Sequence, residues 1–201
     1  MQQAGEPFSR VDDILRTIDY TSFLDRRRGP RTIRWWPRAA DAWGVLFHLG
    51  AHPGAQLQQW LAGVLGDLGV RKFGDLAFVD PGSSLPPEKS YRLVVTASDL
   101  SRQRIMYLPW DLAKHGHDPA EFSVARAVRA SAAIPFLFEP VRVKSPFGQL
   151  ALADGSLLRS YPIELFDRDD GLPARWPTLG VRLSSPAGER AKAKPVTGPV
   201  S

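Results

Sequence analysis

An aspartate that follows an apolar strand is the residue of this sequence best suited to chemistry. Asp154 comes directly after residues 149–153 (QLALA), a run typical of a strand buried on both faces, and Gly155 and Ser156 follow it. A carboxylate is unfavourable in apolar surroundings unless it is hydrogen-bonded or paired. Asp154 therefore either forms a turn at the rim of a sheet or is poised to accept a proton. Because Asp-Gly is a common turn dipeptide, Asp154 alone favours the turn.

A helix and a pair of strands should position Asp154. Residues 118–121 (DPAE) combine a helix-capping aspartate, a proline at the first helical position and an acid in the first turn, which predicts a helix from there to about Ala132. Pro135 stops that helix. Two short apolar strands follow, joined by a turn at residues 146–148 (PFG), and the second strand leads into Asp154.

Apolar patterning predicts further elements outside this region. Apolar residues recur at three- and four-residue steps over residues 53–68, which indicates a core-facing helix with Pro53 in its first turn. Residues 9–18 have the pattern of an amphipathic helix with a capping-box-like start at Ser9. The predicted strands are residues 91–97 and 104–108, as a hairpin or neighbouring pair, and residues 177–183.

Longer segments on both sides of Asp154 carry a family likeness. The segments concerned are residues 95–100 (VTASDL), 129–135 (RASAAIP), 138–141 (FEPV), 154–155 (DG), 157–158 (LL), 161–163 (YPI) and 176–180 (WPTLG). In this order they resemble the patatin-like phospholipases, a family of lipid acyl hydrolases, and the last of them resembles a segment common in bacterial members. The likeness covers most of residues 9–185, and Asp154-Gly155 falls on the family's Asp-Gly-Gly or Asp-Gly-Ala motif.

The resemblance implies a fold and a chemistry. The fold is a three-layer α/β arrangement with a mostly parallel central sheet. The chemistry is a Ser-Asp dyad, in which a serine attacks the ester carbonyl of a phospholipid or another acyl lipid and Asp154 is the general base. Desolvation can bring the pKa of a carboxylate nearer that of a useful base, so no histidine is required between the two. No metal and no organic cofactor is implied.

The nucleophile that this chemistry needs has no counterpart in the sequence. The 201 residues contain no Gly-x-Ser-x-Gly pentapeptide and no Gly-rich oxyanion loop. In the family both precede the segment that residues 7–25 resemble. We therefore expect the first strand and the nucleophile helix to be absent from this chain. Residues 1–185 are expected to form a partial patatin-like domain that is inactive alone, and residues 186–201 a disordered polar tail.

Several residues offer alternatives to this interpretation. Ser131 and Ser156 are alternative nucleophiles, although neither lies in a Gly-x-Ser-x-Gly motif or has a base next to it in the sequence. Asp99, at a strand end, is either a second functional carboxylate or the cap of a turn. His115 and His117 lie two residues apart with no matching ligand pair elsewhere, so a metal site is not expected. The rival function is a non-catalytic lipid-binding or interaction remnant of the family.

A basic and aromatic cluster lies at residues 26–38. It holds six arginines and no acid, a local charge of +6 that exceeds the net +5 of the whole chain. Arginines next to a tryptophan pair suit the interface of a lipid bilayer, where the cations meet phosphates and the indoles lie at headgroup depth. A solvated structural loop is the alternative, and no nucleic-acid partner is expected because no nucleic-acid fold signature accompanies the cluster. The lipid-surface candidates are Arg26, Arg27, Arg28, Arg31, Arg34, Trp35 and Trp36.

The overall composition limits the class of protein and the kinds of chemistry that are possible. With 43% hydrophobic residues, the chain fits one globular domain large enough to bury a core. The absence of cysteine excludes disulfides and thiol catalysis. No signal peptide and no apolar run of bilayer-spanning length occurs, so we expect a cytoplasmic protein whose membrane contact is peripheral.

Overall fold

The computed structural model describes residues 13–14, 16–25, 50–159, 161–168, 172–173 and 177–181. The chain divides into two compact units, Met1–Ser160 and Tyr161–Ser201, which are described separately. The first unit contains Asp154 and every strand and α-helix named below.

A four-stranded antiparallel sheet forms the centre of the first unit. Its strands are β2 (Val95–Asp99), β3 (Arg104–Leu108), β5 (Val141–Val143) and β6 (Leu150–Asp154), in the order β3-β2-β6-β5. β2 and β3 form the predicted hairpin, with Val95 opposite Leu108 and Asp99 opposite Arg104. β5 and β6 form a second hairpin, whose connection contains Gly148 at φ +99°, a conformation that glycine adopts without strain.

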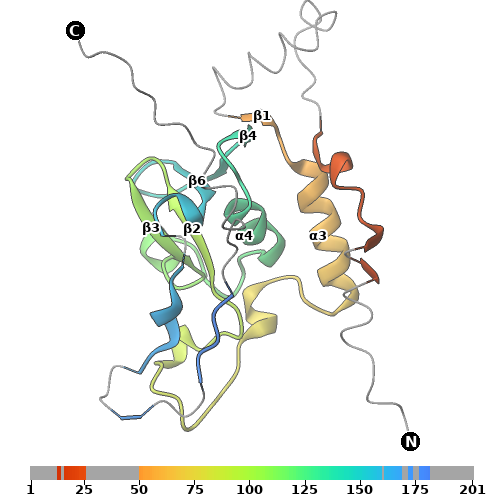
Figure 1. Ribbon diagram of the computed structural model, residues 1–201. Helices are drawn as coiled ribbons and strands as arrows, with labels where there is room; N and C mark the ends of the chain where they lie inside the picture. Colours follow the sequence, from red (N-terminus) through yellow and green to blue (C-terminus); the bar gives the residue numbers. More distant parts are fainter. Residues whose placement is uncertain are drawn as a thin grey trace, which may run out of the picture. The chain divides into compact units, whose positions relative to one another are not determined.

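Two helices pack beside this sheet. They are α3 (Ala55–Asp67) and α4 (Val124–Ser131). Figure 1 shows α4 between the sheet and α3, and α4 contacts both β2 and β6. α3 corresponds to the helix predicted over residues 53–68, but none of its residues is fully buried, so it covers the core with one half-buried face.

The predicted start of α4 at Asp118 is wrong. The Asp118 carboxylate instead accepts the N–H of Ala120 at 2.9 Å and closes a turn. Residues 122–124 then pair with residues 71–73, since Phe73 N donates to Phe122 O and Val124 N to Arg71 O, both at 3.1 Å. This extended pairing delays the helix to Val124, and its N-cap is Ser123, whose Oγ accepts the N–H of Arg126 at 3.3 Å.

Parallel pairing is confined to two short strands among the described residues. β1 (Gly50–His52) and β4 (Phe136–Phe138) run parallel, with Gly50 opposite Phe136 and His52 opposite Phe138. The mostly parallel central sheet expected from the family is therefore not what this part of the chain forms. Its two strand pairs that follow one another in sequence, β2–β3 and β5–β6, are joined by short connections, and such connections permit antiparallel pairing alone.

Short 3-10 helices connect these elements. They are η1 (Tyr20–Phe23), η2 (Phe73–Leu76), η3 (Pro87–Lys89), η4 (Ala113–His115), η5 (Gly155–Leu157) and η6 (Ile163–Phe166). Four residues of the helix expected over residues 9–18 are described as helical, Asp13, Ile14, Arg16 and Thr17, and its predicted start at Ser9 lies outside the described residues.

Two apolar clusters flank α4. The larger one joins the four-stranded sheet to α4 and includes Met106, Leu108, Val124, Leu150 and Leu152, all completely buried. The smaller one consists of Phe23, Ala133, Phe138 and Ala153, with Ile18, Leu57 and Trp60 packed against it. The smaller cluster links β4 and the end of β6 to α3.

The second unit is described only in part. It contains η6, and residues 177–181 have no regular structure, so the strand predicted over residues 177–183 is wrong for the five residues that can be described. Residues 186–201 lie outside the described part. None of the helices described in either unit has the length and apolar character needed to cross a bilayer.

Candidate functional site

Asp154 stands at the carboxyl end of β6, where three elements meet. Its N–H donates to the carbonyl of Ala133, just beyond α4, at 3.0 Å, and its partner across the sheet is Ala97 of β2. Residues 150–153 are all buried, as predicted for a strand covered on both faces, whereas Asp154 is half-buried. The aspartate therefore lies at the rim of the core.

One oxygen of the Asp154 carboxylate is used to build the turn. Oδ1 accepts the N–H of Ser156 at 2.8 Å, which makes Asp154 the N-cap of η5. The described residues supply no hydrogen bond to Oδ2. Asp154 therefore forms the turn that its sequence favours, and this role occupies one of its two carboxylate oxygens.

The close packing around Gly155 leaves no room for a side chain at this position. A Cβ at this position would clash with Thr96 Oγ1 and come within 2.6 Å of the Thr96 carbonyl oxygen on β2. Gly155 does not have a positive φ, so the close approach to β2, and not backbone conformation, demands glycine. This contact holds the Asp-Gly corner against the sheet.

Neither alternative nucleophile is activated by Asp154. Ser156 lies beside Asp154 but engages it through its backbone N–H, and its side chain is exposed. Among the described non-glycine residues, positive φ occurs at Gln103 and Phe136, so serine at position 156 needs no strained backbone where the family has Gly or Ala. Ser131 is the last residue of α4, and no contact with a base is recorded for it in the described region.

Arg129, the first residue of the family-like segment 129–135, is a buried arginine whose structural role the sequence did not reveal. It is 2% exposed, and its guanidinium donates to Gly54 O at 3.0 Å, Pro53 O at 2.7 Å and Glu139 O at 3.0 Å. Burial lowers the pKa of Arg129, while the negative charges of Asp25 and Glu139 oppose that shift. The signal available in sequence was a charge four residues after Ala125 on the buried side of α4.

Asp25 complements Arg129 at the start of α3. Its carboxylate accepts the N–H groups of Gly54 and Ala55, each at 2.7 Å, and so satisfies orphan donors of the first helical turn. Arg129 binds the carbonyls of the same loop. Together they fix the passage from β1 to α3.

The other polar candidates have structural partners. Asp99 is completely buried, and its carboxylate accepts from Ser101 N at 3.0 Å and Arg102 Nη1 at 3.3 Å, which is the turn-capping alternative. His115 is 3% exposed, and its Nε2 faces Arg104 Nη2 at 2.5 Å. Since arginine can only donate, His115 Nε2 accepts a hydrogen bond from Arg104 and the ring proton is on Nδ1. His115 Nδ1 lies 3.4 Å from Ser145 Oγ and donates to it. His115 in this tautomer cannot accept a proton from Ser145.

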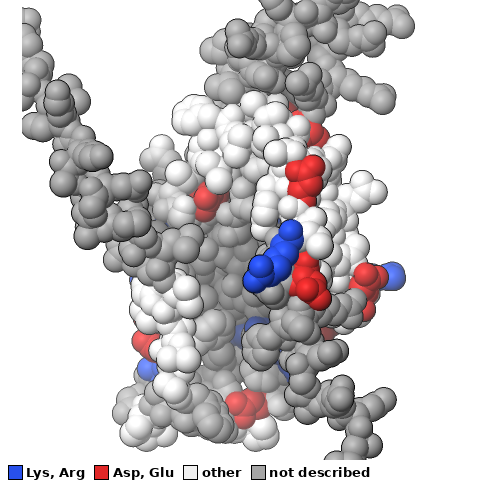
Figure 2. Space-filling model, turned by 45° about the vertical axis from the view of Figure 1, so that its right-hand side comes forward, with Lys and Arg blue, Asp and Glu red and all other residues white. Residues whose placement is uncertain are grey.

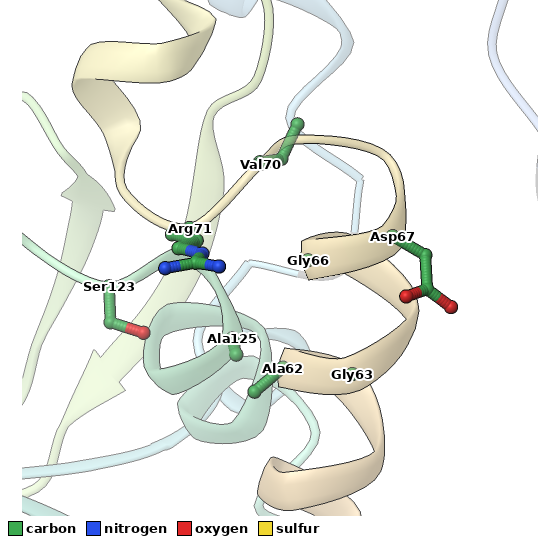
Figure 3. A pocket seen from close by; sticks show the side chains of 8 residues that line it. All are labelled: Ala62, Gly63, Gly66, Asp67, Val70, Arg71, Ser123 and Ala125. Carbon is green, nitrogen blue, oxygen red and sulfur yellow. The ribbon is translucent and has the colours of Figure 1, made fainter.

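A cavity of about 500 Å³ lies between α3 and α4, away from Asp154. Its walls are mostly small side chains, with one acid and one base: Ala62, Gly63, Gly66, Asp67, Val70, Arg71, Ser123 and Ala125. Figure 3 shows the Asp67 carboxylate directed away from the Arg71 guanidinium. Ser123 and Ala125 belong to the start of α4, whereas Asp154 bonds to Ala133 beyond its end, so this cavity does not contain the aspartate.

The predicted lipid-surface residues cannot be placed. Residues 26–49 lie outside the described part of the chain, and with them Arg26, Arg27, Arg28, Arg31, Arg34, Trp35 and Trp36. On the face that Figure 2 presents, acidic and basic side chains of the described residues are mixed. Within the described ranges, no three His, Cys, Asp or Glu residues gather as a group that could hold a metal ion.

Comparison with known proteins shows the family of this chain. Residues 3–167 match the patatin-like phospholipase family. The chain therefore belongs to the patatin-like phospholipase family. It is 32% identical over 191 residues to "Uncharacterized protein YqhO" of Bacillus subtilis (strain 168), a match that covers 94% of this chain and 58% of that relative. The chain thus spans 58% of the length of the curated relative it matches.

Proposed function

We propose that residues 1–201 are part of a lipid acyl hydrolase in which Asp154 is the general base of a Ser-Asp dyad. The observation that carries the proposal is the geometry of Asp154, which is fixed through Oδ1 and Gly155 while Oδ2 has no hydrogen bond within the described residues. Family membership supports a lipid ester as the substrate. No residue of this chain is proposed to bind a metal or an organic cofactor.

The dyad needs a serine that a separate segment supplies. The sequence has no Gly-x-Ser-x-Gly elbow, and in the described region neither the Ser131 hydroxyl nor the Ser156 hydroxyl is hydrogen-bonded to a base. In the reaction the serine Oγ attacks the ester carbonyl while its proton passes to Asp154 Oδ2; the ester C–O bond then breaks, and the leaving alcohol takes that proton. Water next attacks the acyl-enzyme and gives a proton to Asp154, which returns it to the serine Oγ as the fatty acid leaves. We propose that the chain alone is inactive, because an isolated base has nothing to deprotonate.

A fluorophosphonate probe and a p-nitrophenyl acyl ester test the proposed hydrolase activity and the proposed inactivity of the chain alone. The purified chain should react with neither. A chimera that joins residues 1–201 to the part of YqhO outside the match should hydrolyse the ester, provided circular dichroism shows it to be folded. YqhO itself should hydrolyse it in a parallel assay. An inactive YqhO over a series of acyl esters and phospholipids would contradict the proposed function.

The role of Asp154 is tested with two matched substitutions in the chimera. Asp154→Asn keeps an oxygen for the Ser156 N–H but removes the proton acceptor, so kcat should fall by roughly a factor of 100 to 10,000. Asp118→Asn is the control, because Asp118 caps an equivalent turn through Ala120 N and is remote in sequence. Equal activity of the two variants would exclude Asp154 as the base. Ester hydrolysis by residues 1–201 alone, lost in Asp154→Ala, would instead point to Ser131 or Ser156.

We also propose that the arginine and tryptophan cluster contacts the lipid surface. The support is its sequence together with a family that acts on lipids. Each basic side chain near an anionic surface contributes about 1 kcal/mol. Changing Arg26, Arg27, Arg28, Arg31 and Arg34 to Gln should therefore abolish co-sedimentation with anionic vesicles, and binding of the parent chain should weaken with salt and on neutral phosphatidylcholine. Equal sedimentation of the two folded proteins would assign this segment a structural role.

A further inference from the structure

The cavity between α3 and α4 is a space that the packing of the two helices leaves open. Ala62, Gly63 and Gly66 line it from α3, and Ala125 lines it from α4. A Cβ at Gly63 or at Gly66 would meet nothing within 4 Å, so no close contact requires glycine at either position. Glycine inside a helix is less favourable than alanine. The chain thus keeps this wall of the cavity open at a cost to the stability of α3.

Arg71 is the basic residue of the cavity, and its backbone is fixed by two hydrogen bonds. Its N–H donates to Asp75 Oδ2 at 2.8 Å, and its carbonyl accepts the N–H of Val124 at 3.1 Å. The same Asp75 oxygen also accepts the N–H of Lys72 at 3.0 Å. Among the described residues, none of the ion pairs includes the Arg71 guanidinium. The guanidinium therefore has donors that an anion in the cavity can use.

Ser123 places a hydroxyl near this arginine. It forms a β-bridge with Lys72, the residue after Arg71. Ser123 Oγ accepts the N–H of Arg126 at 3.3 Å, and its own proton can be donated to a ligand. Figure 3 shows the Arg71 guanidinium and the Ser123 hydroxyl beside the start of α4, whereas the Asp67 carboxylate is directed away from them. The cavity therefore has two donors at one end and small residues along α3.

We propose that this cavity binds a fatty carboxylate, with the carboxylate on Arg71 and Ser123 and the alkyl chain along the small residues of α3. Its volume of about 500 Å³ is typical of small-molecule sites. Arginine binds a carboxylate through two parallel N–H groups, and apolar walls favour an alkyl chain. The choice of ligand rests on the proposed function, because hydrolysis of an acyl lipid releases a fatty carboxylate. The site is separate from Asp154, which bonds to Ala133 beyond the other end of α4.

NMR titration of the isotope-labelled chain with octanoate tests the proposal. The amide resonances of Gly63 and Gly66 should shift on binding, and that of Gly155 at the Asp154 corner should not. Octanol has the same alkyl chain without the charge and should bind roughly tenfold more weakly or worse, because it loses the charged hydrogen bonds of Arg71. Inorganic phosphate, an anion without an alkyl chain, should shift neither glycine at the same concentration.

Two pairs of variants locate the ligand. Arg71→Gln should weaken octanoate binding roughly tenfold or more, while Arg92→Gln removes the same charge at an exposed position outside the cavity and should bind like the parent. Ala62→Leu should block binding, because Figure 3 shows the Ala62 side chain directed toward α4. Ala55→Leu makes the same change at an exposed position of α3 outside the cavity and should not. The dispersion of each spectrum shows whether the variant is folded.

Four results would overturn the proposal. They are unshifted Gly63 and Gly66 amides, equal binding of octanoate by the parent, Arg71→Gln and Ala62→Leu, equal binding of octanol and octanoate, and shifts that phosphate causes and octanoate does not. The titration does not depend on turnover, since this chain lacks a Gly-x-Ser-x-Gly nucleophile. An inactive YqhO would therefore leave octanoate binding standing, and failure of octanoate to bind would leave the proposed hydrolase function standing.

Discussion

The two sheets of the first unit differ in how far the described residues of this chain bury them. The four-stranded sheet has residues 150–153 of β6 fully buried and packs α4 against a cluster that includes Met106 and Leu108. The β1–β4 pair has three residues in each strand, and Phe136 and Leu137 remain exposed. Hairpins can complete an antiparallel sheet locally, whereas a parallel pair joins distant segments and depends on further layers.

Asp154 lies where these two regions meet. Its side chain belongs to the end of the four-stranded sheet, and its N–H is bound by Ala133, a member of the smaller cluster that includes Phe138 of β4. Asp154 is thus part of the well-covered four-stranded sheet and lies next to the less covered β1–β4 pair. The comparison predicts that substitutions in the two sheets have very different consequences for stability.

Leu152→Ala should have the largest effect. Leu152 is completely buried in β6, so its truncation removes apolar contacts and leaves a cavity, at a cost of about 2–5 kcal/mol in the free energy of unfolding. Leu137→Ala in β4 should cost less than about 1 kcal/mol because that side chain is already partly exposed. Urea denaturation of both variants measures the difference. Similar losses would mean that the β1–β4 pair is as well packed as the central sheet.

Arg129→Met should cost about 3 kcal/mol. It removes the donor to three backbone carbonyls, those of Pro53, Gly54 and Glu139, and hydrogen bonds from a charged group contribute about 1.5–3 kcal/mol each before methionine packing offsets part of the loss. These carbonyls follow β1 and β4, so amide exchange should accelerate at β1 more than at β2.

Arg126→Met is the control for Arg129. Arg126 lies on the same helix and donates to Arg142 O from a partly exposed position, so its replacement should change stability by less than about 1 kcal/mol. If the two methionine variants unfold at the same urea concentration, the buried arginine is not what ties α4 to the β1–β4 pair.

These residues show which features could be predicted from the sequence alone. The Asp154-Gly155 corner and both hairpins were predictable because the signals are local: an apolar run, a turn dipeptide and short connections. The role of Arg129 was not predictable, because its partners at Pro53 and Gly54 lie 76 and 75 residues away. The start of α4 was predicted wrongly for the same reason, since pairing with residues 71–73 overrides the capping preference of Asp118. The arrangement of the sheets follows from such distant pairings.

Gly155→Ala should cost about 1–3 kcal/mol. The added methyl group has no room beside Thr96, so β6 or η5 must shift. Gly63→Ala is the matched control, because a methyl group at that position on α3 would meet nothing within 4 Å and alanine favours a helix by about 0.8–1 kcal/mol. The two variants should therefore move the thermal midpoint in opposite directions. A Gly155→Ala protein as stable as the parent would show that the corner is not held tightly against β2.

The smallest effect concerns pH and belongs to the four-stranded region. Burial, followed by the positive charges of Arg104 and Arg102, lowers the pKa of His115 below its usual value of 6.5. The unfolded chain therefore binds a proton at a pH where folded His115 does not. The stability that depends on neutral His115 is complete above about pH 6.5 and is lost as the pH falls below it, toward the lowered pKa of the folded state.

His115→Gln should flatten this dependence, because glutamine does not titrate. The urea midpoint of the parent chain should fall more steeply between pH 7 and pH 5 than that of the variant. His117→Gln is the control, since His117 is only half-buried and its Nε2 lies 2.6 Å from the carbonyl of Lys144. The variant His117→Gln should keep the slope of the parent. If the urea midpoint changes with pH equally in all three proteins, protonation of His115 does not compete with folding. The surroundings of His115 would then be more open to solvent than its contacts with Arg104 and Ser145 indicate.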